Sequence, residues 1–372
     1  MMSIIGASAG ACYHARMNKL MVIRFPIIVC VILALLGALW AALMRVGWQL
    51  PPLPVPLAGQ HGALMISGFL GTLVSLERAV ALQKKWAYAA PLLAGLGGVT
   101  LLIGLPPAIG RGLITLGSIG LVVIFVFIYR LHPTVDVITM TLGSGMWLTG
   151  NLLWLLGPSI VYATPWWAGF LILTIAGERI ELSRVLMLKP RSRTIFKIAV
   201  SVFSIGLVLS LFVFEVGLKL SGVGLLLLGG WLLRYDIARH TIKKTGLTRY
   251  IAACLLPGYV WLIVGGALWI IYGGNVFAGL TYDALLHTLF VGFIFSMIFG
   301  HAPIIVPAVM PIDITYHWRF YIPLILLQAS LVVRVCADLI LNQPLRMWAG
   351  LFNVLAILIF LGNLILSARR RK

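Results

Sequence analysis

Acidic residues, and charged residues in general, are scarce in this sequence. Its 372 residues include only nine Asp and Glu, and 10% are charged in all, whereas 61% belong to the hydrophobic set. A soluble domain carries about 25% charged residues. The long apolar runs contain no alternating ten-residue strands, so a helical bundle is favoured over a barrel. The composition therefore excludes a soluble enzyme fold and predicts an all-α polytopic membrane protein.

Cysteine is also scarce. The four cysteines lie in the N-terminal tail and in separate predicted spans, and they form no CxxC or CxxCH motif. A disulfide scaffold and a covalently attached c-type haem are therefore disfavoured. An ATP-binding loop, a nucleophile elbow and a metalloprotease motif are missing as well, which disfavours hydrolytic chemistry.

The few charges are mostly positive and unevenly placed. Lys and Arg number 28, which gives a formal charge of +19. In a soluble protein this would suggest nucleic acid, but in a membrane protein it reports topology. Apolar runs predict about twelve transmembrane spans, near residues 21–44, 57–82, 87–105, 110–131, 135–156, 165–188, 194–214, 218–236, 249–272, 281–308, 318–340 and 345–368.

The basic residues sort to one side of these spans. They concentrate in the N-terminal tail, the even-numbered loops and the C-terminal end, and the opposite side holds only Arg45, Arg111, Lys219 and Arg346. The positive-inside rule then predicts that both termini are cytoplasmic. We expect a multi-pass protein of the inner (cytoplasmic) membrane. Its expected partner is the lipid bilayer, and no nucleic-acid partner is expected.

Two sequence fragments recur at intervals of four spans. Trp40, Trp154 and Trp269 close the first fragment, at intervals of 114 and 115 residues. The second fragment reads GFLGTLVSLER from Gly68, GFLILTIAGER from Gly169 and GFIFSMIFGHA from Gly292. The spacing predicts three parallel four-helix repeats, at about 21–131, 135–236 and 249–368, within a single transmembrane domain of residues 1–372.

Two histidines stand at similar depth on repeat-equivalent spans. His61 lies near the start of the second span and His287 near the start of the tenth. Two axial ligands facing across a porphyrin need such a placement, so the pair predicts a bis-histidine b-type haem near the outer face. Met65 and Gly68 follow His61 at helical spacing, and the small residue would let a flat ring approach. The alternative is that each histidine hydrogen-bonds a neighbouring carbonyl or lines a wet cavity.

These motifs resemble a known family. The run QHGALM from Gln60, the segment LHTL from Leu286 and the twelve spans in three groups are similar to the haem-copper oxidase core subunit. They resemble more closely the NnrS family of haem- and copper-associated membrane proteins linked to nitric oxide. The resemblance implies that His61 and His287 bind haem b in a redox or nitric-oxide response, together with a membrane or periplasmic redox partner.

The sequence departs from both families. Oxidases need further histidines in the sixth to seventh spans, and residues 165–214 contain none, so a complete haem-copper reductase centre is not expected. NnrS proteins usually read His-x-His-Glu-Met in the second span, whereas this chain has Leu64 in place of Glu. The resemblance allows copper, but no residue supports it. Oxidases use arginines near the haem propionates, which implies that role for Arg334; the alternative is that Arg334 pairs with Asp338.

A second group of ionisable residues lies in the cytoplasmic halves of the second, sixth and tenth spans. These residues are Glu77, Arg78, Glu178, Arg179, Glu181, Arg184 and His301. One interpretation is a salt-bridge network that fixes how the repeats pack. The other is a proton or ion path, with His301 as a relay, in a proton- or ion-coupled transporter or channel built on Glu77, Glu178 and His301.

Overall fold

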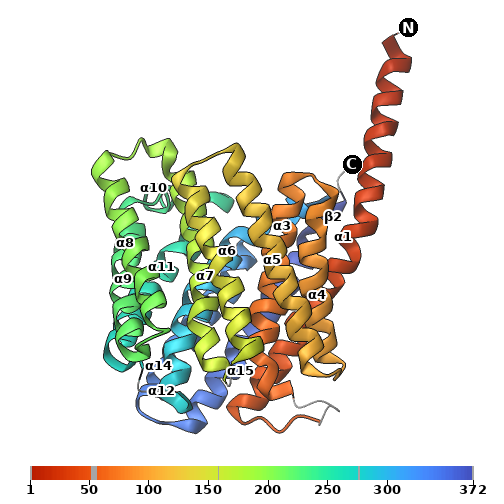
Figure 1. The fold of residues 1–372 in the computed structure, drawn as a ribbon. Helices are drawn as coiled ribbons and strands as arrows, with labels where there is room; N and C mark the ends of the chain where they lie inside the picture. The colour runs from red at the N-terminus through yellow and green to blue at the C-terminus, as the bar shows by residue number, and fades with distance from the viewer. Residues whose placement is uncertain (1, 52–56, 158, 275–276, 371–372) are drawn as a thin grey trace. The chain divides into compact units, whose positions relative to one another are not determined.

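The computed structural model describes residues 2–51, 57–157, 159–274 and 277–370, and helices dominate it (Figure 1). The α-helices are α1 (Met2–Val46), α2 (His61–Ala63), α3 (Thr72–Leu82), α4 (Ala89–Leu102), α5 (Pro107–Leu131), α6 (Val135–Leu156), α7 (Ile160–Leu182), α8 (Pro190–Leu209), α9 (Phe214–Tyr235), α10 (Ala238–Thr241), α11 (Gly246–Tyr272), α12 (Gly279–His287), α13 (Ser296–Val309), α14 (Tyr321–Leu339) and α15 (Gln343–Ser367). Two segments are π-helices, η2 (Leu64–Gly71) and η5 (Thr288–Phe295).

The remaining elements are short. Four 3₁₀ turns occur among the described residues, η1 (Leu57–Gln60), η3 (Lys85–Tyr88), η4 (Ser183–Leu186) and η6 (Trp318–Phe320). Strands β1 (Ile312–Ile314) and β2 (Ala368–Arg370) pair antiparallel, with Asp313 opposite Arg369. The prediction of an all-α fold is therefore confirmed apart from this short ribbon.

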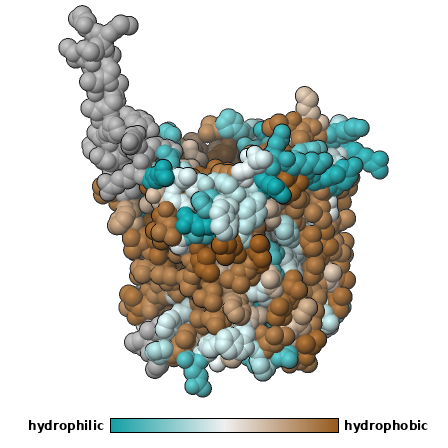
Figure 2. Space-filling model, turned by 180° about the vertical axis from the view of Figure 1, so that it is seen from behind, coloured by the Kyte–Doolittle hydropathy of each residue, from teal (hydrophilic) through white to brown (hydrophobic). Residues whose placement is uncertain are grey.

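Ten helices within the described ranges are long and apolar enough to cross a membrane. They are Val22–Val46, Leu57–Leu82, Pro107–Leu131, Ile160–Leu186, Pro190–Leu209, Phe214–Tyr235, Gly246–Tyr272, Gly279–Val309, Trp318–Leu339 and Gln343–Ser367. Helices also lie at the other two predicted spans, but α4 has only 14 residues and α6 carries Asp136 and Asn151, which lower its mean hydropathy. Figure 2 shows hydrophobic residues along the sides of the helices and hydrophilic ones gathered toward their ends. The chain has the character of a multi-pass membrane protein.

The described residues divide into two compact units. The first takes its residues from Met1–Ala41, Pro52–Ile124 and Ala308–Pro311, and the second from Ala42–Pro51, Phe125–Pro307 and Ile312–Lys372. In the first unit, α4 packs on η2 and α3. In the second, the most extensive helix contacts are those of α6 with α7, α8 with α9, α9 with α11, and α14 with α15.

Glycine allows a close contact between α9 and α11. A Cβ atom added at Gly222 of α9 would lie 2.7 Å from the carbonyl oxygen of Gly266, and one added at Gly266 of α11 would lie 2.8 Å from the carbonyl oxygen of Gly222. The two backbones therefore meet directly. Small residues favour this kind of approach because helices in lipid associate through close packing.

Candidate functional site

A π-helix follows each of the two histidines predicted to bind haem. Helix η2 begins three residues after His61, and η5 begins directly after His287. Both π-helices have eight residues, and Gly68 and Gly292 hold the fifth position of each. Such segments are rare and occur frequently at functional sites. They also change the spacing of side chains from that of the α-helix assumed for Met65 and Gly68.

His61 is held by a backbone carbonyl of the first unit. Its Nδ1 atom lies 2.9 Å from the carbonyl oxygen of Ala38 in α1. The carbonyl can only accept, so Nδ1 carries the proton, and the neutral ring keeps its lone pair on Nε2. The alternative interpretation predicts a contact of this kind, and the contact is also compatible with a haem ligand because Nε2 stays available.

The residues that follow His61 are packed. Met65 is buried. A Cβ atom at Gly68 would lie 3.2 Å from the Cβ of Ala34 and 3.4 Å from the Cα of Gly98. Gly68 therefore brings η2 against α1 and α4, and this face of η2 is filled by helix packing.

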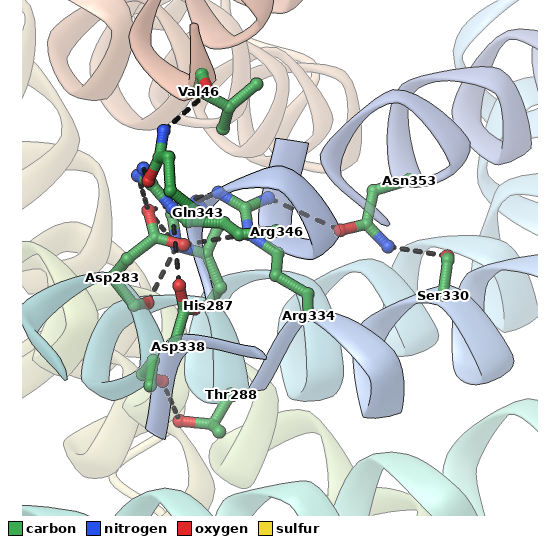
Figure 3. Close-up of polar contacts among 11 residues, drawn as sticks. Val46, Asp283, His287, Thr288, Ser330, Arg334, Asp338, Gln343, Arg346 and Asn353 are labelled. Atoms are coloured by element: carbon green, nitrogen blue, oxygen red, sulfur yellow. Dashed lines mark hydrogen bonds and ion pairs between the residues drawn. The ribbon is translucent and has the colours of Figure 1, made fainter. Parts of the chain in front are cut away.

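His287 belongs to a buried charge cluster of the second unit, shown in Figure 3. We call Asp283, His287, Arg334, Asp338 and Arg346 the His287 cluster. Arg334 binds Asp283 with two hydrogen bonds, from Nε to Oδ2 at 2.8 Å and from Nη2 to Oδ1 at 3.0 Å. His287 donates from Nδ1 to the carbonyl oxygen of Asp283 at 2.8 Å, and its Nε2 lies 3.3 Å from Nη2 of Arg334. One ring nitrogen of His287 therefore contacts the backbone of Asp283 and the other contacts the guanidinium of Arg334.

Arg346 joins the two acids of this cluster. Its Nη2 donates to Oδ1 of Asp283 at 3.1 Å, and its Nε lies 3.2 Å from Oδ1 of Asp338. Asp338 is fully buried, and neither carboxylate oxygen accepts a hydrogen bond from the described residues. Such a carboxylate is costly as an anion.

Arg334 does not make the predicted i, i+4 hydrogen bond to Asp338. Besides Asp283, it donates to Oδ1 of Asn353 at 3.3 Å, and Asn353 in turn donates to Ser330 at 2.7 Å. Arg334 pairs with Asp283 rather than Asp338 because both carboxylate oxygens of Asp283, on α12, accept from the planar guanidinium. This pairing could not be predicted from the local sequence pattern, since the two residues are 51 positions apart.

The same arrangement recurs farther along the span. Arg179 binds Asp236 through Nε at 2.8 Å and Nη2 at 3.2 Å. Nη1 of Arg179 lies 3.0 Å from Nε2 of His301, and Nδ1 of His301 lies 2.7 Å from the carbonyl oxygen of Met297. We call Arg179, Asp236 and His301 the His301 cluster. Each cluster thus contains a histidine held by the carbonyl four residues earlier and an arginine paired with a buried aspartate.

The other predicted network residues have partners both inside and outside the predicted group. Arg78 pairs with its neighbour Glu77 at 2.9 Å. Arg184 pairs with Asp136 at the start of α6. Glu178 interacts with the charge of Arg179, and Glu181 is exposed.

Asp136 and Asp236 were missed by the sequence analysis. Each of these acids lies at the end of a predicted span, and acids are rare in this basic chain. That position was the available signal that each one pairs with a basic residue. Helix-by-helix assignment cannot say which arginine it meets.

One feature of these histidines suits haem binding and another opposes it. The carbonyl contacts of His61 and His287 leave Nε2 as the lone-pair nitrogen, which is the state that an axial ligand needs. However, Nε2 of His287 faces the guanidinium of Arg334, which is itself engaged by Asp283. Within the described ranges, no group of three or more His, Cys, Asp or Glu residues is arranged to hold a metal ion.

Comparison with known proteins identifies a family of undefined activity. A model described as a domain of unknown function, DUF8744, matches residues 24–369. The chain belongs to the DUF8744 family. No curated protein matches it. Both clusters of this DUF8744 chain lie inside the matched range.

Proposed function

We propose that this DUF8744 protein is a proton-coupled membrane transporter. The observation that supports this is the Asp–Arg–His arrangement that recurs at two histidines of one candidate span, Gly279–Val309. His287 lies near the beginning of the span and His301 fourteen residues later, and each contacts a buried arginine–aspartate pair. Ionisable residues inside a membrane are costly and usually serve transport or proton transfer.

A proton on either histidine would change the partners of its arginine. Neutral His287 accepts from Arg334 through Nε2, but a protonated ring has no acceptor and carries a positive charge. At 3.3 Å the two cations would repel by about 5 kcal/mol at an effective dielectric of 20. The protonated ring would instead be attracted to Oδ1 of Asp283, which lies 3.3 Å from Nδ1. Protonation therefore sets His287 and Arg334 in competition for one carboxylate.

A proton on His301 would likewise remove the acceptor that faces Arg179 and would place two cations 3.0 Å apart. Two such sites toward opposite ends of one span give a physical basis for opening one end while the other stays closed, because protonation changes the partners of each arginine. Asp338 supplies a further proton site in this proposal: a proton on its buried carboxyl would remove an anion that lies near Arg346 but accepts no hydrogen bond from the described residues.

The topology completes the proposal. We propose that all twelve predicted helices cross the inner membrane, in three parallel four-helix repeats forming one transmembrane domain, with both termini cytoplasmic. The matched position of Gly68 and Gly292 in their π-helices supports the equivalence of the second and tenth spans. The His301 cluster would then lie toward the cytoplasm and the His287 cluster toward the outside.

Proton flux into liposomes tests this function. The purified protein is reconstituted with a pH-sensitive dye inside, and a potassium diffusion potential drives protons inward. We expect the wild type to acidify the lumen, and His287→Gln and His301→Gln each to reduce the initial rate at least tenfold. His240→Gln, which changes an exposed histidine, should leave the rate unchanged. Flux equal to that of empty liposomes, or flux untouched by both variants, contradicts the proposal.

Haem binding is a second candidate, favoured by the carbonyl contacts that fix Nε2 as the lone-pair nitrogen of His61 and His287. In this proposal the two histidines hold one haem b in a redox or nitric-oxide response, with a membrane or periplasmic redox partner. Haem would supply electron transfer or gas binding, and Arg334 would have to leave Nε2 of His287.

A visible spectrum of the purified protein tests the second candidate. We expect a low-spin b-type spectrum that is lost in His61→Ala and in His287→Ala and kept in His132→Ala. A protein purified from haem-supplemented cells without such a spectrum, or with one that survives both histidine variants, rules out this site.

A further inference from the structure

A cavity lies at the end of the second unit where α6 and α8 begin and α7 ends. Its volume is about 410 Å³, within the range of small-ligand sites. Pro133, Thr134, Val135 and Asp136 line it from the start of α6, Ile180, Arg184 and Leu188 from the end of α7 onward, and Arg193 from α8. Neither the His287 nor the His301 cluster contributes a residue.

The charges of the lining favour an anion. The lining contains two arginines, Arg184 and Arg193, and one acid, Asp136, so it carries one net positive charge. Asp136 is buried and pairs with Arg184, whose side chain is 50% exposed and so keeps donors directed outward. Arg193 is exposed. An arginine pair presents several donors in planar forks, a geometry that suits the oxygens of a phosphate.

The start of α6 adds backbone donors to the same cavity. Thr134 is the N-cap residue, but its side chain makes no capping hydrogen bond. Thr134, Val135 and Asp136 at the start of this 22-residue helix line the cavity, and the helix dipole favours negative charge there.

The residues around the cavity indicate which class of anionic ligand it suits. Leu182, Val185 and Met187, from the segment that carries Arg184, are 50%, 79% and 82% exposed. In a membrane protein such residues are solvated by acyl chains. A ligand that lies against them while meeting two arginines must be apolar at one end and anionic at the other. Basic pockets at span ends bind anionic lipid headgroups in this way.

We propose that this cavity binds the headgroup of an anionic phospholipid, with the phosphate held by Arg184, Arg193 and the first turn of α6. The acyl chains would extend along the exposed side chains of Leu182 and Val185. The site is independent of the proposed transport, because it shares no residue with either histidine cluster.

Lipid titration of the purified full-length chain in a phosphate-free detergent tests this site. Short-chain phosphatidylglycerol is titrated against the thermal midpoint, beside short-chain phosphatidylcholine, glycerol 3-phosphate and inorganic phosphate. We expect phosphatidylglycerol to stabilise the protein at concentrations at least tenfold lower than any of the other three. Equal potency of phosphatidylcholine rejects an anion site, and equal potency of the two soluble phosphates rejects a lipid.

Variants locate the binding. Arg193→Gln should weaken phosphatidylglycerol binding about tenfold, whereas Arg239→Gln, at another exposed basic position, should not change it. Because Arg184→Gln alone would leave Asp136 buried without its partner, the double variant Arg184→Gln/Asp136→Asn is used, and it should also weaken binding about tenfold. Equal losses in Arg193→Gln and Arg239→Gln, or no loss in either cavity variant, overturn the proposal.

Discussion

Nε2 of His301 lies 3.0 Å from Nη1 of Arg179, although the two residues are 122 positions apart in the sequence. Arg179 is almost fully buried, and its other guanidinium nitrogens bind Asp236, which is not exposed at all. The histidine therefore contacts a cation whose charge is already balanced. This arrangement links α7, α13 and the residue that follows α9 through one side chain, and it leads to a direct prediction about stability.

Replacing Arg179 with Met should strongly destabilise the protein, because the carboxylate of Asp236 would stay buried without its partner. Breaking a buried ion pair in this way costs about 3–5 kcal/mol. Thermal unfolding in detergent, followed by size-exclusion chromatography, measures the loss. Lys244→Met changes an exposed cation and should leave the midpoint unchanged. Partial recovery in Arg179→Met/Asp236→Leu would confirm the cause; no recovery would place the damage elsewhere.

The contact between η2 and α4 predicts a size limit at Gly98. A Cβ atom there would lie 3.0 Å from the Cα of Gly68, and backbone cannot move aside as a side chain can. Gly98→Val should destabilise the protein by about 1–3 kcal/mol through overpacking. Gly112→Val is a suitable control, since nothing lies within 4 Å of a Cβ atom at that position. Equal stability of the two variants in a detergent melt would show that the helices do not meet at Gly98.

Much of the fold could be predicted from the sequence, because lipid imposes a simple rule on it: every span must be an apolar helix. Helices occur at all twelve predicted ranges. The π-helices after His61 and His287 could not be predicted in this way, since an apolar run has the same composition in either helical form.

The candidate site was predicted only in part. Hydropathy identifies His287, Arg334 and His301 as unusual because each interrupts an apolar run. It does not say which residues they meet, and the acids that pair with the arginines, Asp283 and Asp236, are 51 and 57 positions away. Pairings between distant helices depend on how the helices pack, and a span-by-span analysis carries no information on that.

A polar bridge between α11, α13 and α14 predicts a smaller loss. Nε1 of Trp261 donates to Oε1 of Gln328 at 2.7 Å, and Nε2 of Gln328 donates to Oγ of Ser296 at 2.8 Å. Gln328→Leu keeps the size of the side chain but leaves the indole N–H without this acceptor, which should cost about 1–3 kcal/mol. Adding Trp261→Phe removes the donor that was left, so the double variant should lose less than the sum of the two single changes. Strict additivity in a double-mutant cycle would mean that the bridge contributes nothing.

The two acids of the His287 cluster should respond differently to the same change. Asp283 accepts hydrogen bonds from both Arg334 and Arg346 and lies beside His287, so Asp283→Asn leaves two buried cations short of a carboxylate and should cost about 3–5 kcal/mol. Asp338 accepts no hydrogen bond from the described residues, and its amide analogue has the shape of a protonated carboxyl. Asp338→Asn should therefore change the stability by less than about 1 kcal/mol, because no hydrogen bond to a charged group is lost. Thermal midpoints of both variants at neutral pH make the comparison. If Asp338→Asn is as damaging as Asp283→Asn, Asp338 is an ionised partner of Arg346, and the proton assigned to it in the transport proposal has to be withdrawn.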